Sequence, residues 1–479
     1  MADASKFFID GEWVDPVHPG GEIVVVDPAT EQEVARVAAA SPADVESAVG
    51  AAHRAFPAWS RTTKEERLEA LAAVREAYKR RIPEIAAAMT TEVGIPKGLA
   101  EGGQVLAGAA HLKQAMNALR DYPLEQDWGS TRIVREPIGV CALLAPWNWP
   151  MNQVTCKVGP ALAAGCTVVL KPSQLSPLSA LLFAEAVDEA GLPAGVFNMV
   201  NGAGAALGDA FAMHPLVDMV SLTGSTAVGG VVAAAAAPSI KRVSLELGGK
   251  SANLVFGDVD VERVVRSGVL GCMHNSGQSC NAPTRMLVAQ EIYDEAVEIA
   301  ARTAEAVAVG DPTDAATFMG PVAGRKQFDT VRGYIQTGIE EGARLVAGGL
   351  ARPDRLDKGF FVRPTVFADV TPEMRIFQEE IFGPVLVMTP FRDEEHAIEL
   401  ANATVYGLSG YVQSADLERA RRVAGRMRTG MVHLNGAPTD AGAPFGGYRQ
   451  SGNGREWGRF GLEDYLEVKA VMGWSPQAR

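Results

Sequence analysis

The sequence predicts an α/β fold built on a mostly parallel, doubly wound sheet. Between Gly139 and Lys250, short apolar runs alternate with longer stretches of helical periodicity. Such alternation implies right-handed crossovers that place helices on both faces of a parallel sheet. The alternation resumes after Lys250, which indicates a second α/β unit. A chain of 479 residues has room for about three domains.

Short strands and helices precede this region. The segments "FFIDGEWVDP" and "EIVVVDPAT" are closed by turn residues and are typical of strands. Ser41 and Pro42 suit the N-cap and first turn of a helix. Thr63 and Glu66 stand at capping-box spacing before an apolar helical face. We expect these helices to pack on the sheet.

The predicted elements follow one another in a regular order. Strands of the first unit are "GVCALLAPWNW", "CTVVLKPS", "GVFNMVNG", "LVDMVSLTGS" and "KRVSLELGG", and its helices are "QVTCKVGPALAAG", "PLSALLFAEAVDEAG" and "AVGGVVAAAAA". Strands of the second unit are "SANLVF", "MLVAQ", "RLVAGG" and "GPVLVMTPF", and its helices are "EIYDEAVEIAARTAEAV" and "EEHAIELANA". Ligands of doubly wound folds collect at the carboxyl ends of the strands, so we expect a site there.

Two further segments alternate polar and apolar residues. These are "STRIVREPIG", before the alternating region, and "EDYLEVKAVMGW", at the end of the chain. The pattern is typical of an exposed hairpin and a terminal strand. Unpaired strand edges favour pairing with another subunit.

Charge and cysteine usage restrict the function classes. A net charge of −13 argues against a nucleic-acid partner. The N-terminal segment lacks the pattern of a signal peptide, and the longest apolar run, "VVAAAAAP", is too short for a bilayer, so we expect no membrane association. Five cysteines without a CxxC pair fit neither a disulfide framework nor a zinc site. We expect a cytoplasmic protein without a bound metal.

Several predicted strands end in residues that suit a nucleotide. A Gly-Ser-Thr step before a helix, as at Gly224 to Thr226, presents backbone N–H groups to an anion. The glycines at 202, 204 and 208 do not complete a GxGxxG fingerprint, because Leu207 occupies the third glycine position. Tight turns without a ligand therefore remain the alternative.

Cys280 differs from the other cysteines in its surroundings. Cys141 and Cys166 have apolar neighbours and suit the core, whereas Cys156 and Cys272 have no decisive context. Cys280 lies in "NSGQSCNAPTR", where small and polar residues leave a thiol accessible and backbone donors can stabilise its thiolate. A nucleophile is the functional interpretation. His274 is a candidate base, with a structural histidine as the alternative.

Seven motifs occur in a characteristic order. They are "PWNWP" at 146–150, "LKPS" at 170–173, "LTGST" at 222–226, "LELGGK" at 245–250, "GQSC" at 277–280, "EEIFGPV" at 379–385 and "PFGGYRQSGNGRE" at 444–456. Over essentially its whole length the chain resembles the NAD(P)-dependent aldehyde dehydrogenase superfamily, in its hydrolytic, non-phosphorylating branch.

The resemblance implies an aldehyde dehydrogenase-like architecture with three parts. These are a Rossmann-type cofactor domain of residues 1–120 and 139–249, an α/β catalytic domain of residues 250–442, and a small β oligomerisation element of residues 121–138 and 460–479. It also implies assembly as a homodimer or homotetramer.

The resemblance assigns the chemistry to five residues. Cys280 would attack the aldehyde, and the Asn148 amide with the Cys280 N–H would stabilise the oxyanion of the thiohemiacetal. Loss of hydride to the nicotinamide leaves a thioester, which water activated by Glu246 would hydrolyse. Lys157 and Glu456 match a pair that relays the proton from that base, with a structural salt bridge as the alternative.

The cofactor contacts are likewise implied by the resemblance. It puts Lys171 on the adenine ribose, Ser225 on the pyrophosphate, Glu380 on the nicotinamide ribose and Phe382 against the nicotinamide ring. The remaining contacts are Ala145, Trp147, Ser173, Gln174, Gly202, Gly204, Gly224, Val228 and Leu247. Gln174 stands where NAD-preferring relatives often carry glutamate, whose charge repels a 2′-phosphate. We expect NAD, with NADP also used.

The substrate is the least determined feature. Residues near the motifs that border the aldehyde site are Trp149, Asn152, Gln153, Ser279, Asn281 and Phe445. No arginine is required to face the aldehyde, so a carboxylate-bearing substrate is not demanded. We expect medium-chain or aromatic aldehydes, including ω-oxo acids held loosely at the far end.

Two rival functions remain open. A CoA-acylating semialdehyde dehydrogenase would share the fold, but relatives of that kind lack a glutamate at the position of Glu246. A cofactor-free cysteine hydrolase or a binding scaffold would require loss of NAD binding.

Overall fold

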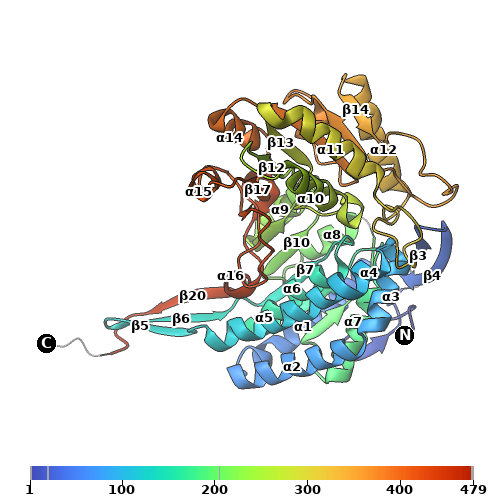
Figure 1. The fold of residues 1–479 in the computed structure, drawn as a ribbon. Coiled ribbons are helices and arrows are strands. Elements are labelled where there is room, and N and C mark those ends of the chain that lie inside the picture. The colour runs from blue at the N-terminus through green and yellow to red at the C-terminus, as the bar shows by residue number, and fades with distance from the viewer. Residues whose placement is uncertain (1–2, 19–20, 204, 476–479) are drawn as a thin grey trace.

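The structure is a computed structural model that describes residues 3–18, 21–203 and 205–475. Two mixed sheets, each covered by helices, form the body, which confirms the α/β prediction. Figure 1 shows most of the first sheet and its helices in blue to green, and the second part in olive green to red. Both helix caps predicted near the N-terminus are present at Ser41 and Thr63.

The first sheet has the strand order β19-β11-β10-β7-β8-β9-β1-β2. Its central strands are parallel, whereas β1, β2 and β19 pair antiparallel at the edges. The bounds are β1 Phe7–Ile9, β2 Glu12–Val14, β7 Val140–Leu144, β8 Thr167–Lys171, β9 Phe197–Met199, β10 Met219–Thr223, β11 Arg242–Glu246 and β19 Gly452–Asn453. The strand predicted for "GVCALLAPWNW" thus ends at Leu144, and Pro150 begins the next helix, where a proline is well tolerated.

Apolar side chains of this sheet pack on both faces. In β8, Val168 and Leu170 belong to one hydrophobic cluster and Val169 to another. Alternate residues of a strand point to opposite faces, so a continuous apolar run is buried when helices cover both. The helices of this part are α1 Pro42–Trp59, α2 Lys64–Arg80, α3 Ile82–Val93, α4 Lys97–Leu99, α5 Val105–Asp121, α6 Pro150–Ala164, α7 Pro177–Ala190, α8 Ala205–Ala212 and α9 Thr226–Ala236.

The second sheet has the order β14-β15-β16-β13-β12-β17-β18 and is parallel except for β14. Its strands are β12 Ala252–Val255, β13 Arg285–Ala289, β14 Arg344–Ala347, β15 Thr365–Ala368, β16 Val385–Phe391, β17 Ser409–Gln413 and β18 Met431–Leu434. Its helices are α10 Val261–Met273, α11 Tyr293–Glu305, α12 Arg325–Glu340, α13 Arg375–Gln378, α14 Glu394–Asn402 and α15 Leu417–Ala424.

A three-stranded antiparallel arm projects from the body (Figure 1). It consists of β5 Glu125–Trp128, β6 Thr131–Pro137 and β20 Leu466–Val471, in the order β20-β6-β5. The predicted hairpin and terminal strand therefore pair within one chain. A separate hairpin joins β3 Glu22–Asp27 to β4 Gln32–Ala38, and α16 Gly458–Asp464 precedes β20.

Candidate active site

The site lies where the two sheets meet. Strand β11 ends at Glu246, and the chain passes through two glycines into β12. In the second sheet β12 pairs in parallel with β13, and β13 with β16. The segments before these three strands carry Gly249, Cys280 and Glu380, and they lie side by side at one edge. Glu246 therefore lies at the carboxyl end of its strand, where ligands of doubly wound folds collect, whereas Cys280 and Glu380 stand at the amino ends of strands.

Two glycines allow these segments to approach closely. A Cβ at Gly248 would lie 2.1 Å from Glu380 Oε2, and one at Gly249 would lie 2.3 Å from the Cys280 carbonyl oxygen. The Gly249 N–H donates to Glu380 Oε1 at 3.0 Å. Buried Ser451, which the sequence did not single out, donates its hydroxyl to the Gly248 carbonyl at 2.6 Å. The backbone after Glu246 is thus fixed between Glu380 and Cys280.

The loop before Cys280 has an unusual backbone. Asn275, Ser276 and Gly277 have φ angles of 53°, 56° and 71° in succession. Positive φ in non-glycine residues costs free energy and is retained where surrounding contacts enforce it. The Asn275 side chain supplies one such contact, since its Nδ2 donates to the Asn148 carbonyl at 2.8 Å.

Asn148 connects this loop to the first sheet. Its Nδ2 donates to the Gln278 carbonyl at 3.0 Å. The Gln278 side chain is itself held, because its Oε1 accepts the Ala323 N–H at 2.9 Å. One Nδ2 hydrogen of Asn148 is used in this contact, and an amide carries two. Asn275 and Gln278 were not predicted, although both are polar residues of the same loop motif.

Glu246 is a buried carboxyl without a hydrogen-bond partner. It is 2% exposed, and neither side-chain oxygen has a partner in the part of the chain that the structure describes. Burial raises the pKa of Glu246 well above its usual range, and the nearby Glu456 carboxylate adds to this rise. An unpaired buried carboxyl is costly, which is typical of a functional group rather than a structural one.

The predicted pair of Lys157 and Glu456 is present. Lys157 Nζ lies 2.5 Å from Glu456 Oε1, and both residues are buried. Lys157 also donates to Ser221 Oγ at 3.0 Å, and the Cys156 thiol donates to Glu456 Oε2 at 3.3 Å.

Cys280 differs from the other cysteines in accessibility. The thiols of Cys141, Cys156, Cys166 and Cys272 are buried, whereas Cys280 is partly exposed and none of the five is in a disulfide. Burial of the sulfur raises the pKa of the Cys280 thiol, and the carboxyls of Glu380, Glu246 and Glu456 raise it further. The resting thiol is therefore neutral, and attack requires removal of its proton.

The residues predicted to hold a cofactor lie at the end of β8 or follow β7, β8, β9, β10 or β11, except for Glu380 and Phe382, which precede β16. Lys171 Nζ donates to the carbonyls of Pro172 at 3.0 Å and Gly202 at 3.5 Å, and burial lowers its pKa to about 8. Ser225 caps α9, with its hydroxyl accepting from the Val228 N–H at 3.3 Å. Gly224 does not offer its N–H to an anion as expected, because that group donates to the Glu246 carbonyl at 3.0 Å.

The other cofactor positions complete this surface. Burial raises the pKa of Glu380 to about 7. Phe382 and Trp147 make an edge-to-face contact with ring centroids 5.5 Å apart. Ser173 accepts the Leu175 N–H, Gln174 is exposed, Ala145 and Leu247 are buried, and Gly204 lies outside the described residues. The Lys171 amine, the Ser225 hydroxyl at the start of α9 and the Glu380 carboxyl fit the phosphates and ribose hydroxyls of a dinucleotide.

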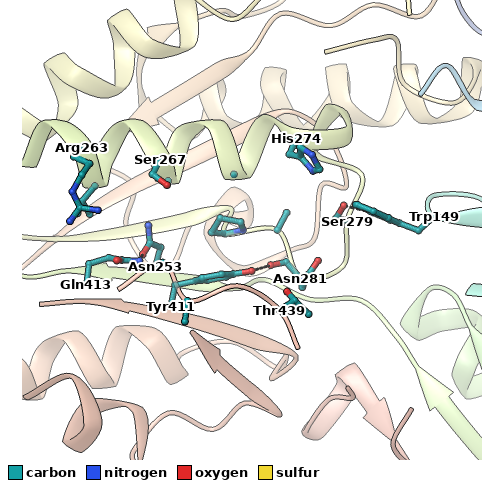
Figure 2. Close-up of a pocket in the computed structure, with 17 residues that line it drawn as sticks. Trp149, Asn253, Arg263, Ser267, His274, Ser279, Asn281, Tyr411, Gln413 and Thr439 are labelled. Atoms are coloured by element: carbon teal, nitrogen blue, oxygen red, sulfur yellow. Dashed lines mark hydrogen bonds between the residues drawn. The ribbon is translucent and has the colours of Figure 1, made fainter. Parts of the chain in front are cut away.

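A cavity of about 380 Å³ is lined by Ser279 and Asn281, the two sequence neighbours of Cys280 (Figure 2). Of the predicted substrate residues, Trp149, Ser279 and Asn281 line it, and Trp149 Nε1 donates to Ser279 Oγ at 2.7 Å. Arg263, which the sequence did not single out, also lines it.

The other three predicted substrate residues lie outside the lining of this cavity. Asn152 Oδ1 is 2.5 Å from Nε2 of buried His111, whose pKa burial lowers to about 4. Phe445 packs on Trp457 with ring centroids 4.4 Å apart, and Trp457 contacts His111. Gln153 is buried. His274, the candidate base, contacts Trp149 with ring centroids 5.9 Å apart and lines the cavity.

The described residues form neither a metal-binding cluster nor a membrane-spanning helix. No group of three or more His, Cys, Asp or Glu side chains is arranged to hold a metal ion within residues 3–18, 21–203 and 205–475. Over the same described residues, no helix has the length and apolar character needed to cross a membrane.

Comparisons with known proteins agree with this geometry. Residues 13–471 match the model of the aldehyde dehydrogenase family. The chain is 53% identical over 475 residues to 3-succinoylsemialdehyde-pyridine dehydrogenase of a Pseudomonas species, covering 99% of each. A variant of aldehyde dehydrogenase C from Pseudomonas syringae, solved with NAD+ and octanal, has a TM-score of 0.98 and 51% identity, with coverage of 99% and 97%.

A more distant structure has the same fold. Betaine aldehyde dehydrogenase of Staphylococcus aureus, in complex with NAD+, has a TM-score of 0.94 and 36% identity, with coverage of 99% of this chain and 95% of that one. The chain therefore belongs to the aldehyde dehydrogenase family and is an oxidoreductase that acts on aldehydes.

Proposed function

We propose that this enzyme oxidises an aldehyde to the free carboxylic acid with NAD, through a thioester on Cys280. The observation that supports this most is the buried, unpaired carboxyl of Glu246, which directly precedes the backbone packed against Cys280. Such a group can activate water beside a thioester.

The cofactor would be held by the residues around the first sheet. Lys171 and Ser173 would bind the adenosine ribose, Ser225 the pyrophosphate, and Glu380 the nicotinamide ribose. When bound, NAD supplies the acceptor for the two electrons that leave the aldehyde. Two of the solved relatives contain NAD+. Uncharged Gln174 leaves NADP as a second cofactor, because an amide does not repel a 2′-phosphate.

Cys280 performs the covalent step. As its thiol gives up its proton to the unpaired Glu246 carboxylate, Sγ bonds to the aldehyde carbon and the carbonyl oxygen becomes an oxyanion. The second Nδ2 hydrogen of Asn148 and the Cys280 N–H donate to that oxygen. The hydrogen bond from Asn148 to Gln278 orients the amide before substrate arrives.

Glu246 performs the hydrolytic step. Its carboxylate accepts a proton from water, the water oxygen bonds to the acyl carbon, and the carbon–sulfur bond breaks. The remaining proton of that water passes to the departing sulfur, so the products are the carboxylate and the Cys280 thiol. Glu456 and Lys157 would relay the proton onward from Glu246. Acylation of CoA is not favoured, because it has no use for a base in this position.

The substrate class rests on the cavity and on the relatives. Trp149, His274 and Tyr411 give the cavity aromatic walls. One relative is named for a pyridine-bearing semialdehyde, and another was solved with octanal. Aldehydes of medium chain length or with an aromatic group fit these walls.

Assembly and location complete the proposal. The chain would divide into a cofactor domain (1–120 and 139–249), a catalytic domain (250–442) and an oligomerisation element (121–138 and 460–479), a division supported by the presence of two sheets and an arm. Exposed Trp128, Val468 and Met472 on the arm support a homodimer or a homotetramer. A reactive thiol without a disulfide partner supports a reducing, cytoplasmic location.

The test is formation of reduced nicotinamide with NAD and with NADP, over aliphatic, aromatic and ω-carboxylated aldehydes. A rate with NAD, with label from isotopic water in the released acid, is expected. Cys280→Ser, which replaces only the sulfur, is the matched control and should be inactive. No rate with any aldehyde and either cofactor, or a product formed only with CoA, would contradict the proposal.

A further inference from the structure

The cavity lined by Ser279 and Asn281 has two ends of different chemistry (Figure 2). Trp149 and Ser279 stand at one end, and Ser279 directly precedes the nucleophile Cys280 in the sequence. Arg263 and Gln413 stand at the opposite end, with Ser267 and Asn253 beside them. The far end is therefore rich in hydrogen-bond donors, and the near end is partly aromatic.

Helix α10 carries the arginine at the far end of the cavity. Arg263, Ser267 and Gly271 follow one another at intervals of four residues along α10, and His274 follows its last turn. This spacing keeps side chains on one helix face. From Arg263 to His274 the helix advances about 16 Å. A ligand that contacts both ends must therefore be extended.

Arg263 is available to a ligand. Its side chain is 69% exposed, and its nearest acidic partner, Asp260, lies 4.0 Å away. That carboxylate also accepts the Arg263 N–H as the cap of α10, at 3.1 Å. An exposed ion pair of this length contributes little to stability, so the guanidinium can exchange Asp260 for another anion.

A second arginine strengthens the local charge. Arg266 and Arg263 both border a shallow hollow that adjoins the cavity. Within the described parts of the chain, Arg266 makes no ion pair, whereas neighbouring Glu262 is paired with Arg302. Two weakly paired cations on a protein of net charge −13 form a local attraction for an anion.

The facing wall adds a neutral donor. Gln413 Nε2 donates to Asn253 Oδ1 at 3.1 Å, so this contact does not use the amide hydrogens of Asn253. No aspartate or glutamate is present among the described residues that line the cavity. Guanidinium, hydroxyl and amide donors suit a carboxylate ligand, which would replace Asp260 at the guanidinium.

We propose that Arg263 binds the terminal carboxylate of a medium-chain or longer ω-oxo acid while its aldehyde group reaches Cys280. This rests on the proposed function, and it makes Arg263 a determinant of substrate specificity. Short semialdehydes would not span the distance between the two ends.

The experiment compares azelaic semialdehyde with its methyl ester, which differs only in the terminal charge. The ratio of kcat/KM for the acid to that for the ester is measured for wild type, Arg263→Gln and Arg421→Gln. Arg421 is a matched control, since it is 61% exposed on α15 and paired with Glu418. We expect Arg263→Gln to lower the ratio by about tenfold, and Arg421→Gln to leave it unchanged.

Salt gives a second readout. Raising the ionic strength should lower the wild-type ratio and leave that of Arg263→Gln nearly constant, because screening acts on the charge contact. An unchanged ratio in Arg263→Gln would overturn the inference while the proposed function stands. Absence of oxidation of both acid and ester by wild type would instead contradict the proposed function.

Discussion

Lys157 and Glu456 form a buried ion pair at 2.5 Å between α6 and the segment before α16. Burial by itself would lower the pKa of Lys157, but the Glu456 carboxylate, together with Cys156 and Glu246, outweighs this effect, and the pKa is raised. The same carboxylate contributes to the raised pKa of Glu246. The pair is therefore coupled electrostatically to the proposed base.

Variants of Lys157 and Glu456 distinguish a proton relay from a structural salt bridge. Glu456→Gln leaves a buried lysine charge, and we expect a loss of about 3–5 kcal/mol in unfolding free energy. The double variant Lys157→Met, Glu456→Leu should regain stability without regaining turnover, because the proton path is lost. Thermal unfolding and steady-state rates measure both effects. Full turnover in the double variant would assign the pair a structural role.

Asn148 should affect the covalent step. In Asn148→Ala the oxyanion loses one donor, and we expect kcat to fall by about 100- to 1,000-fold. Single-turnover formation of reduced cofactor measures this step directly. Asn275→Ala is the matched control, because it removes a contact of the same loop but no donor to the oxyanion. An equal loss in both variants would mean that loop order, rather than oxyanion stabilisation, is responsible.

The rate of hydrolysis should rise with pH. A base acts when deprotonated, and the pKa of Glu246 is raised by burial, so the acid limb of kcat should lie above the ordinary value of 4.5. Glu246→Gln should lower steady-state turnover by about 100-fold or more, while a first burst of reduced cofactor persists. Rate–pH profiles with burst measurements check this. An unchanged profile in the variant would exclude Glu246 as the base.

Gln174 should govern the choice between NAD and NADP. Gln174→Glu places a charge where a 2′-phosphate would lie, so the NADP to NAD ratio of kcat/KM should fall by about tenfold. Gln174→Ala, which adds no charge, is the control. If both variants change the ratio equally, the hydrogen bond rather than the charge decides the preference.

Local features of the chain determined much of the fold. Alternating apolar runs predicted both sheets, because a strand covered on two faces requires apolar residues throughout. Ser41 and Thr63 predicted helix starts, because a cap is satisfied by groups within three residues. The accessible setting of Cys280 also followed from its own loop, since small neighbours leave a thiol open.

Only the tertiary structure decided how the site is assembled. Lys157 and Glu456 are 299 residues apart in the sequence. Arg263, on helix α10 of the second sheet, lines the same cavity as Trp149, which follows β7 of the first sheet. The register of β12, β13 and β16 brings the segments of Gly249, Cys280 and Glu380 together. No periodicity along the chain encodes such contacts, because they depend on how two separately formed sheets pack. Burial of Glu246, and hence its raised pKa, arises from the same packing.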